Sequence, residues 1–512
     1  MRVLGGAALL ATLACQAALA SSDTTLIVNA RIADGTGAPA FEGAVRIKGD
    51  RIVAVGDLKS AAGETVVDAG GLTLAPGFID THSHHDSGLF EDRAALPVVS
   101  QGVTTIVVGN DGSMSYPVRE LFERQAKTPA AINVATYVGH GDLRNAVMGK
   151  DYKRHATPVE VARMKAMVTE GMEAGALGLA TGLEYDPGIN SDTGEVIELA
   201  KEAARFGGRY ISHVRSEDRW FWAAIDEIVR VGREAKIPVQ VSHMKLAMVD
   251  WWGQSRRLLD ILDEARADGV EITADVYPYE YWHSTLTVMF PDRDYTNRAT
   301  AEFILKSIAP ADGLLIAEYS LEPSLVGKTI AEIAGSKGMD EPATLMELTA
   351  RSQVDGASER VIGTSMRADD VAAIIAWPHS NICSDGRLVG LHPRNTGTFT
   401  KVLRAYVREQ KLLGFEEAIR KMTSLGAAHV GIVDRGTIRA GAYADLVLLD
   451  PATVADRSTT TDPTALSVGI RTVWVNGEVV YRDGQSTGAT PGKGLKRTSA
   501  SSAVPRIAAQ NR

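Results

Sequence analysis

Leu74-Ala-Pro-Gly-Phe-Ile-Asp-Thr-His-Ser-His84 is the stretch that decides the fold of this 512-residue chain. Its apolar start is typical of a short buried strand, and the stretch ends in His82 and His84. Residues two apart in a strand point to the same side, so the two imidazoles face one point. Two converging imidazoles make half of a divalent metal site. The rest of the chain has to supply the remaining ligands.

Seven more apolar segments follow the first predicted strand, 74–81, and helical stretches such as 158–173 and 220–235 lie between several of them. This alternation is typical of a parallel α/β architecture. Eight strands with crossover helices favour a (β/α)8 barrel, whose chemistry collects at the carboxyl ends of the strands. A doubly wound open sheet is the alternative, but no Gly-rich phosphate loop follows the first strand. The other predicted strands are 104–108, 133–138, 177–180, 210–212, 239–242, 271–275 and 381–385.

Short β-type runs separated by Gly and Asp turns occupy both ends of the chain, at 21–73 and 431–493. We expect the two halves to combine into one small composite β-sandwich domain. The barrel would then cover 74–286 and 351–430.

The barrel pattern is interrupted after the seventh strand. Roughly a hundred residues separate Asp275 from Asn381, far more than an ordinary strand-to-helix connection needs. We therefore predict a folded insertion at 287–350. The polar, Ser-rich segment 494–512 is predicted to be a disordered tail.

The first twenty residues have the pattern of a signal peptide. Arg2 precedes an apolar run at 3–13, and Ala18-Leu19-Ala20 forms a cleavage site. A transmembrane anchor is the competing interpretation, but the run is too short for one. A lipoprotein site at Cys15 is a poor match to the residues before it. We expect cleavage after Ala20 and a periplasmic location.

Charge and cysteine content exclude several classes of function. The net charge is −9, and the sequence has no block of like charge. Nucleic acid is therefore not an expected partner, and neither is a membrane surface after signal cleavage. Cys383 would be the only cysteine of the exported chain, which excludes an internal disulfide.

Residues with metal-binding side chains fall at the ends of the predicted strands. A lone His or Asp at such a place is usually structural, but six of them in register favour a metal site. Imidazoles and carboxylates suit Zn²⁺, with Mn²⁺ or Co²⁺ as further candidates, and a carboxylate on the last strand could carry a proton to a leaving amine. This chemistry predicts hydrolysis of an amide. The six residues are His82, His84, Asp111, His213, His243 and Asp385.

Further motifs give the chain a resemblance to a known family. With the His82/His84 stretch and the two β-domain halves, they resemble the amidohydrolase superfamily and, within it, the D-aminoacylase (N-acyl-D-amino-acid deacylase) family. The motifs are Gln101-Gly-Val-Thr-Thr105, Val138-Gly-His-Gly-Asp-Leu-Arg144, Ala180-Thr-Gly-Leu-Glu-Tyr-Asp-Pro-Gly188, Ser242-His-Met-Lys245, Asp275-Val-Tyr-Pro-Tyr279, Ser384-Asp-Gly386, His392-Pro-Arg-Asn-Thr-Gly-Thr-Phe399 and Lys421-Met-Thr-Ser-Leu425.

The resemblance implies a metal-dependent hydrolase barrel that cleaves a small N-acyl amino acid, of the D series. A dipeptide, a cyclic amide or an N-acyl-L-amino acid is the alternative substrate. The alternative from another class is an inactive periplasmic metal- or ligand-binding protein. An intact Asp385 argues against that alternative, because binding alone needs no base.

The resemblance also implies roles for single residues. His82 and His84 match one metal pair, His213 and His243 match the ligands of the tightly held zinc, and Asp385 matches the catalytic carboxylate. Three more residues match positions expected to meet the substrate's α-carboxylate, for which cationic groups are suitable. For the two cations among them, a structural salt bridge is the alternative. The three residues are Lys245, Tyr279 and Arg394.

One position departs from the family pattern. Where the family usually has a zinc-binding cysteine after the second strand, this chain has Gly109-Asn110-Asp111-Gly112. A carboxylate is still a competent ligand and can bridge two ions, so the site could hold one or two metals. The fourth strand lacks the lysine that bridges the metals in many amidohydrolases, which makes Asp111 the best bridging candidate and Glu184 a distant second. Cys383 is expected to be an inert core thiol.

Overall fold

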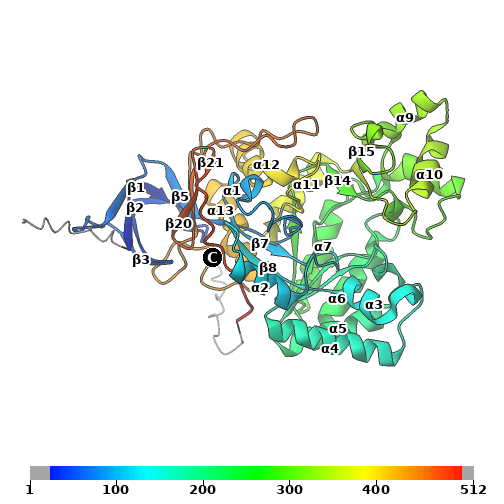
Figure 1. Ribbon diagram of the computed structural model, residues 1–512, viewed down its shortest axis with the longest axis horizontal. Helices are drawn as coiled ribbons and strands as arrows, with labels where there is room; N and C mark the ends of the chain where they lie inside the picture. Colours follow the sequence, from blue (N-terminus) through cyan, green and yellow to red (C-terminus); the bar gives the residue numbers. More distant parts are fainter. Residues whose placement is uncertain (1–22, 499–512) are drawn as a thin grey trace, which may run out of the picture.

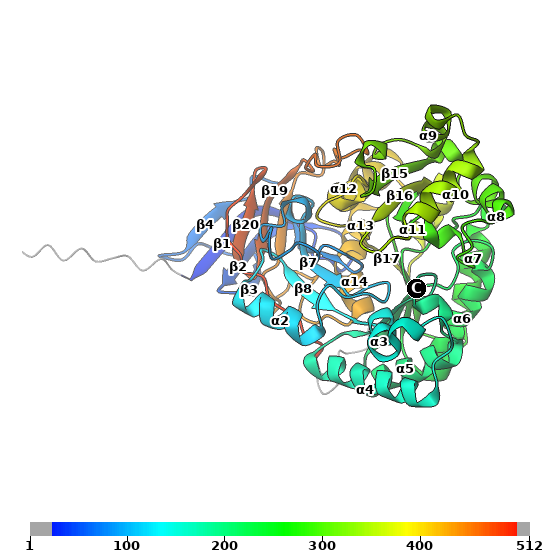
Figure 2. The same ribbon diagram turned by 45° about the vertical axis from the view of Figure 1, so that its right-hand side comes forward.

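A ring of parallel strands forms the centre of the molecule in the computed structural model (Figures 1 and 2). The structure describes residues 23–498, so the predicted signal peptide lies outside the described residues. One end of the ring runs β6-β7-β8, and the chain continues from β8 into β9 of the sheet β9-β10-β11-β12-β13-β17. The ring closes where the Asp385 backbone N–H donates to the His82 carbonyl at 2.9 Å. The predicted barrel is therefore present, and the open sheet is excluded.

The barrel strands overlap the predicted segments, but the first and the third predicted strands are each divided in two. They are β6 (Phe78–Asp80), β7 (Val103–Val108), β8 (Asn133–Thr136), β9 (Val138–Gly139), β10 (Gly178–Gly182), β11 (Arg209–His213), β12 (Val239–Val241), β13 (Ile272–Val276) and β17 (Ser380–Ile382). Every residue of β7 is buried, as expected for a strand covered on both faces.

Helices cover the outside of the barrel, and α4, α5, α6 and α7 lie side by side along it (Figure 2). Helix α4 begins with a capping box in which Thr157 and Glu160 bond reciprocally to each other's backbone N–H. Helix α6 buries Phe221, Ile225 and Ile228 against the strands, one apolar stripe of an amphipathic helix. The helices around the barrel are α1 (Leu96–Val99), α2 (Val118–Lys127), α3 (His140–Met148), α4 (Pro158–Ala174), α5 (Thr193–Arg205), α6 (Phe221–Ala235), α7 (Ser255–Ala267), α11 (Ala368–Ala376), α12 (Arg394–Lys401), α13 (Phe415–Met422) and α14 (Ser424–Val430).

The two chain ends combine into one β-domain beside the barrel, at the left of Figure 1. Antiparallel pairing of Leu74 with Leu448 joins the two halves. The strands are β1 (Thr24–Ile32), β2 (Phe41–Lys48), β3 (Arg51–Gly56), β4 (Thr65–Asp68), β5 (Thr73–Pro76), β18 (Leu446–Leu449), β19 (Ile470–Val475), β20 (Glu478–Arg482) and β21 (Gln485–Ser486).

The predicted strand 74–81 is in fact two strands. β5 pairs with β1 and β18 in the β-domain, whereas β6 pairs with β7 in the barrel. Gly77 lies between them, at a place where an added Cβ would stand 2.3 Å from the Thr104 side chain. The β-domain therefore extends to Pro76, beyond the expected boundary at 73.

The insertion is larger than the predicted 287–350. Its sheet has the order β14-β16-β15, and both β14 (Tyr281–Ser284) and β16 (Glu359–Thr364) lie outside the expected bounds. β14 precedes the predicted segment and β16 follows it, and the two strands pair with each other in antiparallel fashion. The other elements are β15 (Leu314–Tyr319), α8 (Arg298–Phe303), α9 (Ile330–Lys337) and α10 (Glu341–Arg351). Figure 1 shows this insertion at the upper right.

The segment after Lys493 is ordered at its start, contrary to the predicted tail. The Leu495 N–H donates to the Val134 carbonyl at 2.7 Å, and the Arg497 N–H donates to the Gly175 carbonyl at 2.9 Å. Residues 499–512 lie outside the described part of the chain. Within 23–498, no helix combines the length and the apolar character needed to span a bilayer.

Candidate metal centre

Three of the predicted site residues follow their strands in the left-handed backbone region. Asp111 has φ 54°, His243 has φ 32° and Asp385 has φ 49°. Non-glycine residues rarely adopt these angles, and they persist where the surrounding structure enforces them. Directly after a strand, such a turn redirects the side chain, and here all three side chains are directed towards one point at the barrel mouth.

Two groups of potential ligands meet at Asp111. One contains His82, His84, Asp111 and Asp385, and the other contains Asp111, His213 and His243, with the ligand atoms of each group within 4.8 Å of one another. Asp111 Oδ2 lies 3.2 Å from His84 Nε2, while its Oδ1 lies 3.5 Å from His243 Nε2. One carboxylate therefore presents an oxygen to each group. This is the geometry of a bridging ligand.

Several buried polar atoms in these groups have no hydrogen-bond partner among residues 23–498. Both ring nitrogens of His82 are unpartnered at 0% exposure, and so is Asp111 Oδ1. Nearly all buried polar atoms in proteins find a partner, so unpaired imidazole nitrogens that face carboxylates fit a metal site. Burial alone would raise the pKa of Asp111, but His82 and His243 outweigh burial and hold it well below its usual range. An ionised carboxylate is the form that binds a cation.

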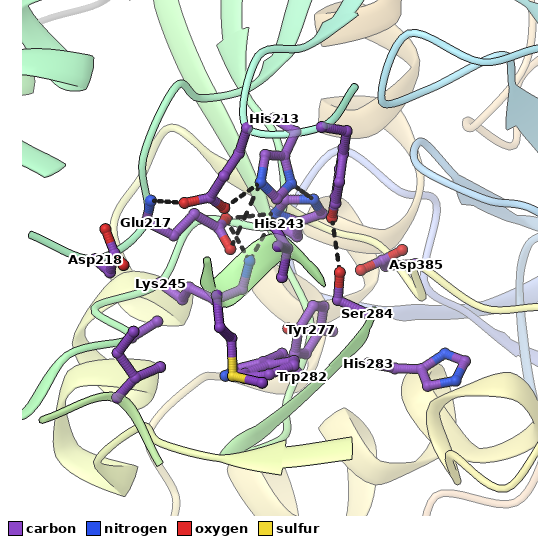
Figure 3. Close-up of a pocket in the computed structure, with 16 residues that line it drawn as sticks. His213, Glu217, Asp218, His243, Lys245, Tyr277, Trp282, His283, Ser284 and Asp385 are labelled. Carbon is purple, nitrogen blue, oxygen red and sulfur yellow. Dashed lines mark hydrogen bonds and ion pairs between the residues drawn. The ribbon is translucent and has the colours of Figure 1, made fainter. Parts of the chain in front are cut away.

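Two glutamates, Glu184 and Glu217, contact the histidines of the second group, and Figure 3 labels Glu217 beside them. His213 Nδ1 faces His243 Nε2 at 3.0 Å, which leaves His213 Nε2 to meet Glu184 Oε2 at 2.9 Å. His243 Nδ1 lies 3.1 Å from Glu217 Oε1, and the Glu217 N–H donates to Glu184 Oε1 at 3.0 Å. A carboxylate on the far nitrogen fixes the tautomer and orientation of a metal-binding imidazole. Glu184, the second candidate for a bridge, therefore lies behind His213 instead of between the two groups.

Asp385 touches both the first ligand group and a cation. Its Oδ1 lies 3.3 Å from His84 Nε2, and its Oδ2 lies 2.7 Å from Arg394 Nη1. Burial would raise the pKa of Asp385, but Arg394 and His84 outweigh burial and keep it well below its usual range. The carboxylate is therefore ionised and has one oxygen on each side of the site.

The structure brings two of the three predicted substrate residues to the site. Arg394 is almost completely buried and its Nε has no hydrogen-bond partner. Lys245 Nζ lies 2.6 Å from Glu217 Oε1 and 2.8 Å from His243 Nδ1 (Figure 3). Lys245 thus borders the cavity, but it is also part of the polar network behind His243.

Tyr279 lies away from the cavity, and Tyr277 takes the expected place. The Tyr279 hydroxyl donates to the Pro393 carbonyl at 3.3 Å, and its ring packs under Lys401 Nζ at 3.9 Å. Tyr277 lines the cavity beside Lys245, its ring lies 4.9 Å from Arg394 Cζ, and its hydroxyl has no hydrogen-bond partner.

Cys383 is buried below the site, as expected of a core thiol. Its Sγ donates to Asp275 Oδ1 at 3.1 Å, and burial raises its pKa well above the usual value. Asp275 also accepts from the His243 backbone N–H at 2.5 Å and from Gln240 Nε2 at 2.6 Å. This arrangement supports the left-handed turn at His243 and assigns the thiol no ligand role.

Two cavities meet at Asp385, and both are lined by Tyr185, His283 and Ser284. The first, here called the apolar cavity, has an empty volume of about 490 Å³ and borders His213 and His243. One wall of it is apolar and consists of Ala247, Trp282, Val288, Met289 and Ile308. The second, here called the arginine cavity, has an empty volume of about 920 Å³ and borders His84 and Asp111. It also contains Arg360, Arg387 and Arg394.

Comparisons with known proteins agree with this geometry. The chain matches the model of the amidohydrolase family over residues 65–311 and 343–481. D-aminoacylase from Alcaligenes xylosoxydans xylosoxydans is 37% identical over 500 residues, which cover 93% of this chain and 98% of that protein.

Two solved structures have the same fold, each with a TM-score of 0.83 and each covering 92% of this chain and 99% of the other. N-acyl-D-glutamate deacylase from Bordetella bronchiseptica, 35% identical, was crystallised with zinc and a phosphonate that mimics the tetrahedral intermediate. A D-aminoacylase, 34% identical, has a binuclear metal centre in which one metal activates and the second attenuates. The resemblance predicted from the motifs is confirmed: this chain belongs to the amidohydrolase family and, within it, to the D-aminoacylases.

Proposed function

We propose that this protein is a zinc-dependent hydrolase that cleaves the amide of N-acyl-D-amino acids into a carboxylic acid and a free D-amino acid. One observation carries the proposal: Asp385 contacts a metal-site imidazole with one oxygen and Arg394 with the other. A proton carrier thus lies between the metal ligands and a cation suited to the α-carboxylate. The relatives named above, which include D-aminoacylases and an N-acyl-D-glutamate deacylase, support the D series.

The residues present fit a zinc site by type and by placement. Bound at the two ligand groups, zinc supplies a Lewis acid and lowers the pKa of a water molecule from 15.7 to roughly 7. His82 and His84 would hold it on one side of Asp111, and His213 and His243 on the other. Asp385, ionised beside His84, can accept the proton of the attacking water and deliver it to the leaving amine nitrogen.

The α-carboxylate would be bound by groups whose hydrogen-bond donors are not used by other residues of the protein. Arg394 Nε and the Tyr277 hydroxyl are both buried and unpartnered, and the Arg394 guanidinium stands over the Tyr277 ring. A carboxylate placed between them would satisfy both donors. Lys245 borders the same place and adds a second positive charge. The alternative substrates, a dipeptide, a cyclic amide or an N-acyl-L-amino acid, have no observation in their favour.

The experiment that tests this function is release of free amine from N-acetyl-D- and N-acetyl-L-amino acids by the zinc-loaded protein. We expect turnover of the D series. Asp385→Asn should keep its metal yet lose roughly 10²–10⁴-fold in rate, the usual contribution of a general base. Absence of amine release from every one of these substrates, with metal bound, would refute the hydrolysis of N-acyl amino acids.

A second variant tests the carboxylate contact. Arg394→Met should weaken hydrolysis of an N-acyl-D-amino acid far more than hydrolysis of the matching amide, which lacks the negative charge. The amide serves as the control for any disturbance of Asp385, because Asp385 acts on both substrates. Equal losses on the two would indicate a structural salt bridge.

We also propose that the chain is exported to the periplasm and cleaved after Ala20. Support comes from the apolar run at 3–13 and from Ala18-Leu19-Ala20. Amino-terminal sequencing of the protein purified from a periplasmic fraction should begin at Ser21. A sequence that still begins at Met1 would refute cleavage.

A further inference from the structure

Asp80 is a buried carboxylate beside the metal centre that the proposed reaction does not use. It lies in β6 at 0% exposure. Among residues 23–498, no side-chain nitrogen of a Lys, Arg or His lies within 4.0 Å of its oxygens. A carboxylate removed from water without a cation costs free energy, and hydrogen bonds have to offset that cost. The donors that Asp80 contacts therefore indicate what it holds in place.

Both oxygens of Asp80 accept hydrogen bonds from Ser384, the residue directly before Asp385. The Ser384 backbone N–H donates to Asp80 Oδ1 at 2.8 Å, and the Ser384 hydroxyl donates to Asp80 Oδ2. The same hydroxyl oxygen accepts from the Gly386 backbone N–H at 2.9 Å. Ser384 is as completely buried as Asp80. One hydroxyl, oriented by one carboxylate, thus fixes the chain on both sides of Asp385.

The turn that these bonds hold is the one that directs the Asp385 side chain. Its φ of 49° is rare for a residue with a side chain and persists only where neighbouring groups enforce it. Besides the backbone bond that closes the barrel, the His84 N–H donates to the Gly386 carbonyl at 2.9 Å. The bonds between Asp80 and Ser384 complete this set, and they are the part of it that side chains supply.

We propose that Asp80, acting through Ser384, is a positioning residue for the proton carrier Asp385. It holds the carboxylate where one oxygen meets His84 and the other meets Arg394. This inference rests on the proposed function. Asp385 has to serve first the attacking water and then the leaving amine nitrogen, and a displacement of about 1 Å can cost about 10²-fold in rate.

Two other roles are compatible with the same bonds. Asp80 stands two residues before His82, which would let it serve the metal ligands, and the bonds also join neighbouring strands of the barrel. Ser384→Ala separates these roles, because it removes the hydroxyl and leaves Asp80 in place beside His82.

Ser380→Ala is the matched control for the loss of a buried hydroxyl. Ser380 lies in β17, just before Ser384, and is equally buried. Its hydroxyl donates to the Trp377 carbonyl at 2.9 Å instead of contacting a residue of the site. This variant should be destabilised in the same way, with kcat unchanged.

Asp80→Asn and Ser384→Ala should each lower kcat for an N-acetyl-D-amino acid about 10²-fold, with little change in KM or in zinc content after dialysis. Asp80→Asn keeps the shape but can present a donor where the Ser384 hydroxyl needs an acceptor. The double variant should therefore lose little more than either single variant, because both changes break the same bond. Loss of zinc from Ser384→Ala, or an equal loss of kcat in Ser380→Ala, would overturn the inference.

A change of leaving group reports on the proton directly. In a thioester analogue, sulfur replaces the amide nitrogen of the substrate, and a thiolate leaves without a proton because the pKa of a thiol is only about 8.5. Asp385 then has only the attacking water to serve. We expect the loss of kcat in Ser384→Ala to be about tenfold smaller, or less still, on the thioester than on the amide. Equal losses on both would show that the hydroxyl supports the fold and does not position the proton carrier.

A structural measurement keeps the inference testable if no substrate is hydrolysed, the outcome that would refute the deacylase function itself. In crystals of zinc-loaded Ser384→Ala, the Asp385 carboxylate should leave its contact with Arg394 Nη1. In Ser380→Ala it should keep that contact, which measures 2.7 Å in the unaltered protein. A carboxylate that stays in place in Ser384→Ala would show that Asp80 does not position it.

Discussion

Asp111 is the single residue on which both ligand groups depend, because each of its oxygens faces one group. A thiolate at this place would be a softer ligand, whereas a carboxylate tolerates Mn²⁺ or Co²⁺ better and can span two ions. We therefore expect Asp111 to bridge two metal sites of unequal affinity. His213 and His243 form the site with the more complete set of supporting carboxylates.

We expect Asp111→Ala to lose most of its bound metal, because His213 and His243 then have too few partners. Asp111→Cys should restore tight binding of one zinc and shift the metal preference towards zinc. The measurement is metal content per chain after dialysis, alongside activity with excess divalent ion. Full metal content in Asp111→Ala would mean that the residue only forms a turn.

Glu184 should act on metal affinity through His213. Glu184→Leu removes the acceptor at His213 Nε2 and is expected to weaken zinc binding about 10–100-fold, while Glu184→Gln keeps an oxygen there and should lose less. Zinc affinity is measured by competition with a chelator. Asp218→Asn is the control, because Asp218 lines the same cavity but bonds to Ser216 and Arg219 instead of a histidine. An unchanged affinity in Glu184→Leu would contradict the orienting role.

Sequence pattern identified the residues that the structure brings together at the candidate metal centre, but not the residues that support them. The two-residue spacing of His82 and His84 and the strand-end positions of His213 and His243 follow from strand periodicity alone. Tyr277 and Tyr279 both lie an even number of residues after Asp275, so strand alternation alone places either of them on the side of the site. Only the end of β13 at Val276 shows that Tyr277 is the one that lines the cavity. Glu184 and Glu217 meet their histidines across the barrel mouth, a contact that no local pattern records.

At the scale of elements, the insertion sheet supplies part of both cavity walls. β14 carries Trp282, His283 and Ser284, and β16 carries Arg360. Sequence analysis found an insertion because the barrel pattern was interrupted. It missed β14 and β16, which lie before and after the predicted bounds, because antiparallel pairing between distant residues leaves no periodic signal of its own. The division of 74–81 at Gly77 was missed for a similar reason, since both halves are buried throughout and read as one continuous strand.

The insertion sheet should be sensitive to pH through Glu359. Burial raises the pKa of Glu359 from 4.5 to about 7, although the Leu286 N–H donates to both of its oxygens at 2.8 Å. The folded state thus binds more protons than the unfolded state between pH 4.5 and 7. Its stability falls as pH rises through this window, by up to roughly 3 kcal/mol.

Glu359→Gln, which stays neutral, should match the wild type near pH 5 and exceed its melting temperature increasingly towards pH 8. Thermal unfolding followed across that range is the measurement. Glu341→Gln, at an exposed position in the first turn of α10 of the same insertion, is the matched control and should show no such trend. A constant difference between Glu359→Gln and the wild type at all pH values would refute the assignment.

At the scale of the whole molecule, the last described residues tie the barrel to the β-domain. The Lys493 N–H donates to Asn133 Oδ1 at 3.0 Å, and Asn476 Nδ2 donates to the same oxygen at 2.8 Å. The Val134 N–H donates to the Lys493 carbonyl at 2.9 Å and the Leu495 N–H donates to the Val134 carbonyl at 2.7 Å, so that Gly494 forms a parallel bridge with β8. A disordered tail was predicted for 494–512 because this segment is polar. Amino-acid composition does not reveal hydrogen bonds that are made by the backbone.

Removal of residues 490–512 should lower the melting temperature by several degrees, because it breaks these bonds to β8 and to the end of α4. Removal of 499–512 alone is the control and leaves every one of these bonds in place. Calorimetry on both truncated proteins makes the comparison. Equal melting temperatures would show that the segment 490–498 adds nothing to the stability of the fold.

The pairing of Leu74 with Leu448 also sets an order of events during synthesis. At about 5–20 residues per second, the ribosome needs roughly 20–75 s to travel from the first of these residues to the second. Throughout that time β5 has an unpaired edge, which is a template for pairing with other chains. The nascent protein therefore depends on chaperones or on delayed folding of its amino-terminal strands until its final segments emerge.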